Sequence, residues 1–463
     1  MNYARELKAQ ERFFLRSPHA IVTLVARIKG YISSEMLTEA VGKLQQRHML
    51  LRTRIQSDGH QEHRFTTEGC GDIPIQIVPR SSKEDWINIH ADAVREVFDF
   101  NNRAPIRFIL VQSSEESDLI MLCHHVICDG MSLAYLARDI MTYLGDPTRE
   151  AEVLPDPSPI DLNNFPGDVS QSFIVKAVIK RMNRKWAEKS VYFDLEDYRV
   201  LNQAYWDNYD HELFSIELSE QDTSRLVARC KTEHTTVNSA LTTAYCGAQI
   251  SVQGKQDFHS RMVVAASLRD RIPIPPGEGM GMYAGGVNLK FEYNPGHEIW
   301  ANARDFNKIF RSAFTNKNLF NDINNWLYLD PTILDAIPFK ELGGLVPADA
   351  DRYQKISAFR NQEDVVARIL KQDGLDSLST KLWGTAVTNL GRLDFPSRYG
   401  ALQLERLIFQ PGGGIPLANV NLVLGAVTCA GKLSLVVEFA PQVVNPSTVE
   451  EINATALTWL LEN

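Results

Sequence analysis

The most informative stretch of this chain is His124-His125-Val126-Ile127-Cys128-Asp129-Gly130 (HHVICDG). An apolar run at 119–123 precedes it, and residues 131–137 follow it with apolar side chains at helical spacing. The pattern predicts a buried strand that ends at two histidines, then a short turn, then a departing helix. Adjacent residues of a strand face opposite ways, so one histidine can face a cleft while the other supports the turn.

Asp129 and Gly130 close this turn. Asp129 can orient or fix the turn, and Gly130 permits a tight backbone path. A histidine pair in a satisfied core, followed by an ordinary Asp-Gly turn, would look similar. The strand before, the helix after and the fixed offset of the Asp-Gly pair together favour a rigidly mounted general base.

The composition indicates a globular protein and argues against a role on nucleic acid. The chain has 463 residues, 44% apolar and 23% charged, with a net charge of −9 that disfavours binding to phosphate backbones. The N-terminal MNYARELKAQERFFL has no long apolar region, and no apolar window approaches about 18 residues, so neither a signal peptide nor a transmembrane segment is expected. Six scattered cysteines without a Cys-x-x-Cys pair indicate a reduced, cytoplasmic protein with no metal site.

Strand and helix patterns alternate through two stretches of the chain. A polar region with four prolines between 155 and 166 separates the two stretches and is typical of a domain connection. We therefore expect an N-terminal half at 1–160, a connecting segment at 161–200 and a C-terminal half at 201–463. A final helix is expected after a capping Ser447. The expected strands cover 20–28, 73–78, 106–111, 119–123, 213–218, 261–267, 382–388, 402–409, 420–429 and 433–439.

One basic stretch, KAVIKRMNRKWAEK at 176–189, stands out in the acidic chain. Its apolar residues recur at helical spacing, so it reads as a helix with a solvated basic face. The alternative is a docking patch for an acidic carrier protein or a phosphate-bearing cofactor.

HHVICDG resembles the HHxxxDG motif of the chloramphenicol acetyltransferase-like superfamily. That group includes nonribosomal peptide condensation domains, plant acyltransferases, wax-ester synthases and polyketide-associated acyltransferases. RHMLLRTRI at 47–55 is similar to the RHExLRTxF segment of condensation domains, with Met for Glu and Ile for Phe. FDF at 98–100 and APIR at 104–107 look like the family's FDL and xPLxR segments. TNLGRL at 388–393 and GKLSL at 431–435 look most like the polyketide-associated enzymes of the phthiocerol dimycocerosyl transferase type.

This resemblance implies an α/β fold of two chloramphenicol-acetyltransferase-like halves. Each half would be a mixed sheet with helices, and an active-site channel would run between the halves. His125 would be the catalytic residue, because the family uses the second histidine, and His124 would support it. Gly130 would be structural, and Asp129 would pair with an arginine. Arg269, at the end of an apolar strand in the other half, is the best candidate partner, with Arg52 and Arg392 as alternatives.

The implied reaction is acyl transfer from a thioester to a hydroxyl, in lipid, polyketide or other secondary metabolism. The donor would be acyl-CoA or a phosphopantetheinyl carrier protein of a polyketide or peptide synthase, with no bound cofactor and a small alcohol or amine as acceptor. Asn389 can donate to the substrate or to the oxyanion, and a turn asparagine is an equal alternative. A freestanding amide-forming condensation enzyme and a non-catalytic carrier-protein-binding module are the other two readings. A monomer is expected.

Overall fold

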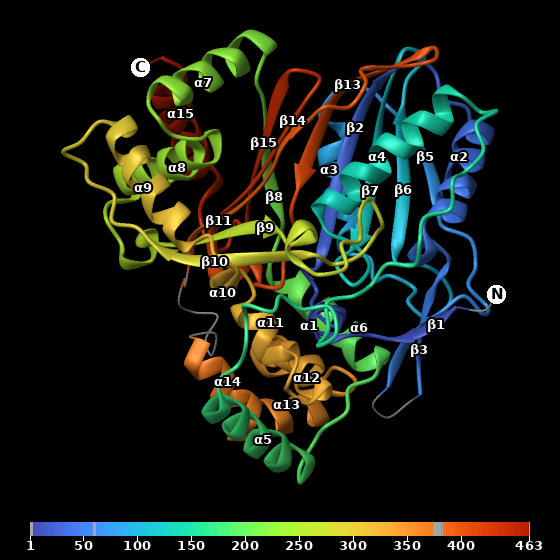
Figure 1. Ribbon diagram of the computed structural model, residues 1–463, viewed down its shortest axis with the longest axis vertical. Helices are drawn as coiled ribbons and strands as arrows, with labels where there is room; N and C mark the ends of the chain where they lie inside the picture. Colours follow the sequence, from blue (N-terminus) through green and yellow to red (C-terminus); the bar gives the residue numbers. More distant parts are fainter. Residues whose placement is uncertain (1–2, 59–61, 374–380, 382, 463) are drawn as a thin grey trace.

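The computed structural model describes residues 3–58, 62–373, 381 and 383–462. Two mixed sheets stand side by side with helices around them, and a layer of helices lies below both sheets (Figure 1). The expected fold class, mixed α/β with two sheet-and-helix lobes, is confirmed. No helix within the described ranges is both long enough and apolar enough to cross a membrane.

The first sheet contains the strand that ends in the histidine pair. Its order is β12-β13-β2-β7-β6-β5. Among the described strands of this sheet, only β5 and β6 pair in parallel. The helices α2 and α4 pack together on this sheet, and α3 contacts β7. The bounds are β2 Ile21–Lys29, β5 Ile75–Pro79, β6 Ile106–Gln112, β7 Glu116–His124, β12 Arg398–Tyr399, β13 Leu402–Gln410, α2 Ser34–Arg47, α3 Asp85–Ala93 and α4 Gly130–Gly145.

The second sheet has the order β10-β9-β11-β14-β15-β8. Its strand β11 lies parallel to both neighbours, β9 and β14, and the remaining pairs are antiparallel. The helices α7, α8, α9 and α15 pack on this sheet and on one another. The bounds are β8 Glu212–Glu217, β9 Arg261–Ser267, β10 Ala284–Lys290, β11 Trp383–Leu393, β14 Val420–Cys429, β15 Lys432–Phe439, α7 Glu220–Thr232, α8 Val237–Gln253, α9 Ile299–Ala313 and α15 Pro446–Leu461.

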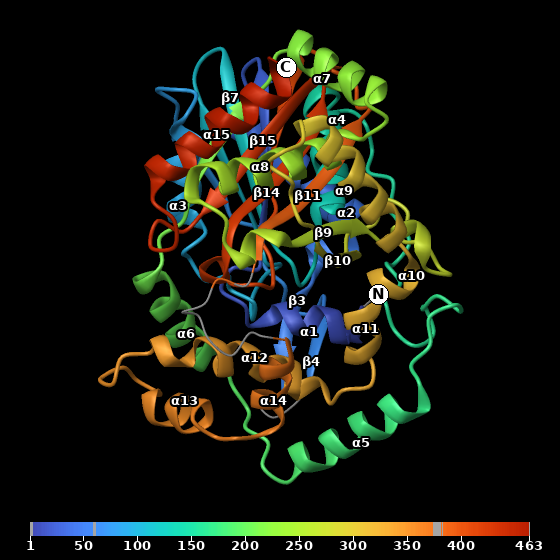
Figure 2. The same cartoon turned by 90° about the vertical axis from the view of Figure 1, so that its left-hand side faces the viewer.

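A small antiparallel sheet and the remaining helices form the lower layer (Figures 1 and 2). The sheet has the order β1-β4-β3, and α1 packs on α12. The bounds are β1 Ala4–Glu6, β3 Arg54–Ser57, β4 His63–Thr66, α1 Ala9–Leu15, α5 Phe173–Ala187, α6 Leu195–Asn208, α10 Asn316–Leu319, α11 Asn321–Trp326, α12 Pro331–Leu342, α13 Tyr353–Arg360 and α14 Val365–Asp373. The sequence analysis does not anticipate the helices between 316 and 373.

The C-terminal half contributes two strands to the first sheet, which the sequence analysis also does not anticipate. The strands β12 and β13 come from the predicted C-terminal half, yet β13 pairs with β2 of the first sheet. The backbones of the two sheets also approach closely, because a Cβ atom at Gly425 of β14 would lie 2.3 Å from the Phe409 carbonyl oxygen of β13. The proposed division at 160 and 201 stays a prediction. The structure adds that β12 and β13, from the C-terminal side of this division, belong to the first sheet.

Most expected strands are present with shifts of a residue or two, apart from residue 382, which lies outside the described part. Strands such as β2 are easy to find because they are buried almost throughout and therefore read as continuous apolar runs. The expected cap of the last helix is wrong: Asn445, not Ser447, is the N-cap, and its side chain accepts a hydrogen bond from the Ser447 N–H. Pro446 occupies the first helical position, which suits its fixed φ.

Candidate active site

His125 lies directly after β7, and both of its ring nitrogens face carbonyl oxygens. Its Nδ1 is 3.1 Å from the Cys128 oxygen, within the same turn. Its Nε2 is 3.0 Å from the Pro411 oxygen, at the far end of β13. The ring of Phe14 from α1 lies 4.9 Å from the imidazole, centre to centre. The histidine is therefore held where its own turn, the end of β13 and α1 meet.

Burial keeps this imidazole neutral at neutral pH. Burial lowers the pKa of His125, while the two carbonyl contacts and the charge of Asp129 act in the opposite direction. A neutral imidazole carries one N–H, so only one of the two carbonyl contacts can be a hydrogen bond at a time. When Nδ1–H donates to Cys128, the lone pair of Nε2 points toward the Pro411 side and is available to accept a proton.

His124 faces the other way, into the core of the first lobe. Its ring stands edge-on to Phe98 and Phe100, with centroid distances of 6.0 and 5.0 Å. Its Nδ1 accepts a hydrogen bond from the Val126 N–H at 3.2 Å. Burial, with contributions from His125 and Arg16, lowers the pKa of His124 well below its ordinary value. This neutral, fully buried ring shapes the turn that carries His125.

Asp129 is the N-cap of α4. Its carboxylate accepts a hydrogen bond from the Ser132 N–H at 2.7 Å, and the Ser132 side chain completes a capping box. This arrangement fixes the angle between the histidine turn and the helix.

Gly130 is required for space rather than for a special backbone angle. The φ of Gly130 is not in the left-handed region, so the need for glycine comes from close packing. A Cβ atom there would lie 2.7 Å from the side chain of Leu390 and 2.8 Å from that of Phe409. Both residues belong to strands after residue 380, so the glycine lets α4 pack tightly against the chain of the other half.

Asp129 pairs with Arg269, as the sequence analysis expects. The Arg269 Nη2 lies 3.0 Å from the Asp129 Oδ1, and both side chains are almost fully buried. The other Asp129 oxygen accepts a hydrogen bond from the Tyr283 N–H at 3.1 Å. The two alternative arginines lie elsewhere: Arg392 pairs with Asp394 at an exposed site, and Arg52 contacts the sulfur of Met49.

Arg269 also holds the loop between β9 and β10. Its Nη1 donates to the carbonyl oxygens of Gly277 and Gly279 at 3.0 and 2.8 Å. The guanidinium lies over the Tyr283 ring, 4.9 Å from its centre. A single buried cation thus joins the start of α4 in one lobe to a loop of the other lobe, and its charge is compensated by Asp129.

Asn389 lies on β11, and its side chain is engaged with its own strand. Its Oδ1 accepts a hydrogen bond from the Gly391 N–H at 2.8 Å, an arrangement typical of a turn asparagine. The residue lines a pocket of about 800 Å³ between β9, β11 and the end of α9, together with Ser267, Arg271 and Phe314. Its expected contact with substrate stays a prediction.

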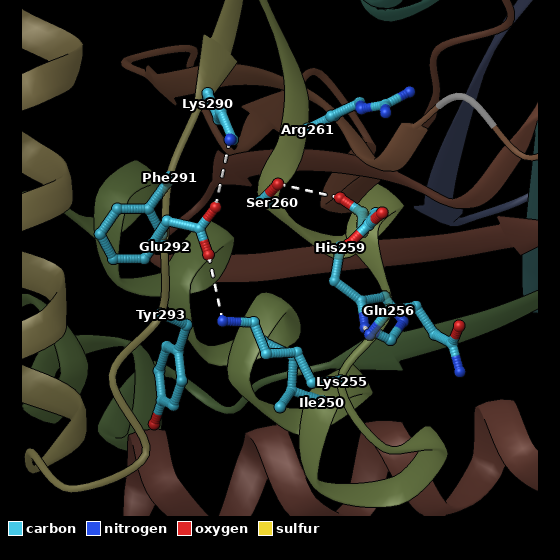
Figure 3. Close-up of a pocket in the computed structure, with 11 residues that line it drawn as sticks. Ile250, Lys255, Gln256, His259, Ser260, Arg261, Lys290, Phe291, Glu292 and Tyr293 are labelled. Carbon is cyan, nitrogen blue, oxygen red and sulfur yellow. Dashed lines mark hydrogen bonds and ion pairs between the residues drawn. The ribbon is translucent and has the colours of Figure 1, made fainter.

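A smaller pocket, of about 210 Å³, lies at the far end of the second sheet (Figure 3). Glu292 is placed there between Lys255 and Lys290, at 3.3 and 3.4 Å. Its walls come from the end of α8 and the outer ends of β9 and β10. The pocket therefore does not include the histidine pair. Across the described ranges, no group of three or more His, Cys, Asp or Glu side chains is arranged to hold a metal ion.

A buried polar cluster close to His125 is missed by the sequence analysis. The carboxylate of Glu438 on β15 lies 2.5 Å from the Nε2 of His19 and 2.9 Å from the Nε2 of His211. Gln410 of β13 donates to its other oxygen at 2.6 Å. Although burial alone raises the pKa of Glu438, the two histidines lower it well below its ordinary value. The residues come from four distant parts of the chain, and no local motif could have grouped them.

His90 of α3 adjoins this cluster and carries a pH-dependent part of the stability. Its Nε2 lies 3.0 Å from the Thr23 Oγ1, and burial together with His211 lowers its pKa to about 3. The unfolded chain binds a proton at this position below about pH 6.5, whereas the folded chain does not. Acidification from pH 7.5 to 5 should therefore remove about 2 kcal/mol of stability through this residue.

His90→Gln is expected to flatten this pH dependence. The free energy of unfolding is measured in urea at the two pH values. The difference between the two values should be about 2 kcal/mol smaller in the variant than in the wild type. His297→Gln, at an exposed site, is the matched control and should leave the difference unchanged. An unaltered pH dependence in His90→Gln would show that His90 is protonated in the folded state.

Comparison with known proteins finds a family model that matches this chain. A family model described as the condensation domain matches residues 9–266. The AMB antimetabolite synthetase AmbB of Pseudomonas aeruginosa is 28% identical over 171 residues, which make up 35% of this chain and 13% of that protein. The chain therefore matches only a small part of this much longer relative.

Two solved structures show the same fold over nearly the whole chain. Polyketide synthase associated protein 5 from Mycobacterium tuberculosis has a TM-score of 0.58 at 16% identity, covering 99% of this chain and 98% of that one. The trichothecene 15-O-acetyltransferase from Fusarium sporotrichioides has a TM-score of 0.62 at 11% identity, covering 99% and 95%. At these identities the likeness concerns the fold.

Proposed function

The chain belongs to the condensation domain family, and from this we propose that it is an acyltransferase in which His125 is the general base. The acyl group would pass from a thioester of CoA or of a carrier protein to a hydroxyl, forming an ester and releasing a thiol. One observation carries this proposal. His125 is a buried, neutral imidazole whose Nδ1 is oriented by a carbonyl of its own turn.

In the proposed reaction, the Nε2 of His125 accepts the proton of the acceptor hydroxyl as its oxygen attacks the thioester carbonyl. The tetrahedral intermediate then expels the thiolate, and the imidazolium returns the proton to that sulfur. The Pro411 carbonyl oxygen, 3.0 Å from Nε2, occupies the position that the acceptor hydroxyl would take. The acceptor hydroxyl would replace this contact when it binds.

The neighbouring residues would hold this histidine in place. His124 packs under the turn, Asp129 and Gly130 fix α4, and Arg269 joins them to the second lobe. Asn389 would contact the substrate or the oxyanion from the second lobe. Its Oδ1 is engaged with Gly391, which leaves the amide Nδ2 to donate.

An amine acceptor, giving an amide, is the second candidate. The curated relatives that match this chain include nonribosomal peptide synthetases by name, such as the hybrid synthetase mpsA of Macrophomina phaseolina. An O-acetyltransferase is among the structures with the same fold, which fits the ester reading. The motif serves both reactions, since an imidazole can take a proton from either nucleophile.

Thiol release tests the proposal. The purified chain is incubated with acyl-CoA or acyl-carrier protein and a panel of alcohols and amines, and free thiol is followed with a chromogenic disulfide. We expect release that depends on the acceptor and is lost in His125→Ala. Acceptor-dependent release with amines alone would establish the amide reading. Tight binding of carrier protein without turnover on any acceptor would instead establish a non-catalytic binding module.

A further inference from the structure

The helix α5 exposes apolar side chains at its N-terminal end. Phe173 is 86% exposed, Ile174 74% and Val178 53%. All three lie within the first two turns of the helix. A single exposed apolar residue is ordinary, but adjacent ones on one element indicate a surface that is covered in use.

The opposite face fastens α5 to the rest of the molecule. Ile179 and Trp186 are buried, and the Trp186 indole donates to the Thr332 hydroxyl at 2.7 Å. The Asn183 amide donates to the Tyr328 carbonyl at 2.8 Å. The helix therefore sits firmly, and its apolar residues are exposed in a fixed position.

Cations cover the rest of the exposed face. Residues 173–189 contain one acid, Glu188, in a chain whose net charge is −9, so the remainder of the chain is more acidic than the whole. Within the described part of the chain, no ion pair engages the four central cations, Lys180, Arg181, Arg184 and Lys185. The basic residues of this stretch are Lys176, Lys180, Arg181, Arg184, Lys185 and Lys189.

The position of α5 suits a broad, flat partner. In both views the helix is the outermost element at the lower end of the molecule (Figures 1 and 2). The pockets described above lie on α8, α9 and the second sheet, away from α5. A projecting helix presents a ridge rather than a groove, so an extended surface can meet both its apolar end and its cations.

We propose that α5 docks this protein onto an anionic lipid surface. Phe173, Ile174 and Val178 would enter the boundary between headgroups and acyl chains, and the cations would lie among the headgroups. Clusters of four to eight Lys or Arg on an amphipathic helix are typical of binding to anionic lipids. For an amphipathic helix at a membrane surface, buried apolar area and electrostatic attraction to anionic lipids add together, so the two features of α5 reinforce each other. Exposed apolar residues at one end of α5 and cations along the rest of its exposed face match the headgroup boundary of an anionic bilayer, and the experiment below separates this from an acidic protein partner.

Vesicle sedimentation of the whole chain tests this proposal. The probes are vesicles of phosphatidylcholine alone and of phosphatidylcholine mixed with phosphatidylglycerol. We expect binding to the mixed vesicles only, and we expect it to weaken when salt rises from about 0.1 M to about 1 M, which shortens the screening length from about 10 Å to about 3 Å. Phe173→Ser with Ile174→Ser, and separately a quadruple glutamine variant, should each weaken binding about tenfold or more. The quadruple variant replaces Lys180, Arg181, Arg184 and Lys185.

A second quadruple glutamine variant changes the net charge equally at exposed sites elsewhere, and it should bind like the wild type. It replaces Arg64, Lys255, Lys290 and Lys308. Thermal unfolding confirms that every variant is folded. Equal loss of binding in both quadruple variants would overturn the proposal, because it would show an effect of net charge alone. Failure of the wild type to bind mixed vesicles, combined with α5-dependent binding to an acidic carrier protein, would overturn it in favour of a protein partner.

Discussion

Replacing His125 with alanine is expected to slow acyl transfer by roughly 100- to 10,000-fold, which is the usual contribution of a general base. The structure places a neutral imidazole at the meeting point of the turn, β13 and α1, with its Nδ1 oriented by the Cys128 carbonyl. Turnover measured by thiol release at saturating donor and acceptor is the readout.

His124→Ala is the matched control for this variant. His124 packs against Phe98 and Phe100 and faces away from His125, so its loss should lower the melting temperature or the soluble yield more than the chemistry. A folded His125→Ala protein with near wild-type turnover would remove His125 from the mechanism.

Asp129→Asn is expected to destabilise the protein by about 3 to 5 kcal/mol and to lower its activity at the same time. The amide can still cap α4, but it leaves the buried Arg269 without a counter-charge. A buried cation that loses its partner retains the full cost of leaving water. Urea unfolding at neutral pH, compared with the wild type, measures the loss.

Replacing both Asp129 and Arg269 separates the effect of the uncompensated charge from the other effects of the Asp129 substitution. Asp129→Asn combined with Arg269→Met removes the uncompensated cation, so the double variant should be more stable than the sum of the two single effects predicts. Full stability of Asp129→Asn with a selective loss of turnover would instead place Asp129 in the chemical step.

The local part of the site could be predicted from the sequence, because its elements are contiguous. One strand, one turn and one helix carry both histidines, Asp129 and Gly130, and the apolar spacing on either side fixes their secondary structure. The resemblance also predicts that Asp129 pairs with an arginine, and Arg269 is the best candidate, but only the structure chooses it over Arg52 and Arg392.

The long-range parts of the site could not be predicted in this way. Gly130 looks like a turn glycine in the sequence, and only the packing of Leu390 and Phe409 shows that it is needed for space. The cluster around Glu438 draws its members from separate elements. The insertion of β13 beside β2 leaves no trace in local periodicity, because a strand reads the same whichever sheet it joins.

The central claim is that His125 acts directly as a base, so that the acyl group never becomes attached to the protein. Intact-protein mass spectrometry after incubation with acyl donor alone tests this most directly. We expect an unmodified mass with donor alone, and ester or amide product only when the acceptor is added. A stoichiometric acyl adduct that forms without acceptor and disappears when acceptor is added would contradict the claim, because it would show a covalent intermediate on a nucleophile of the chain.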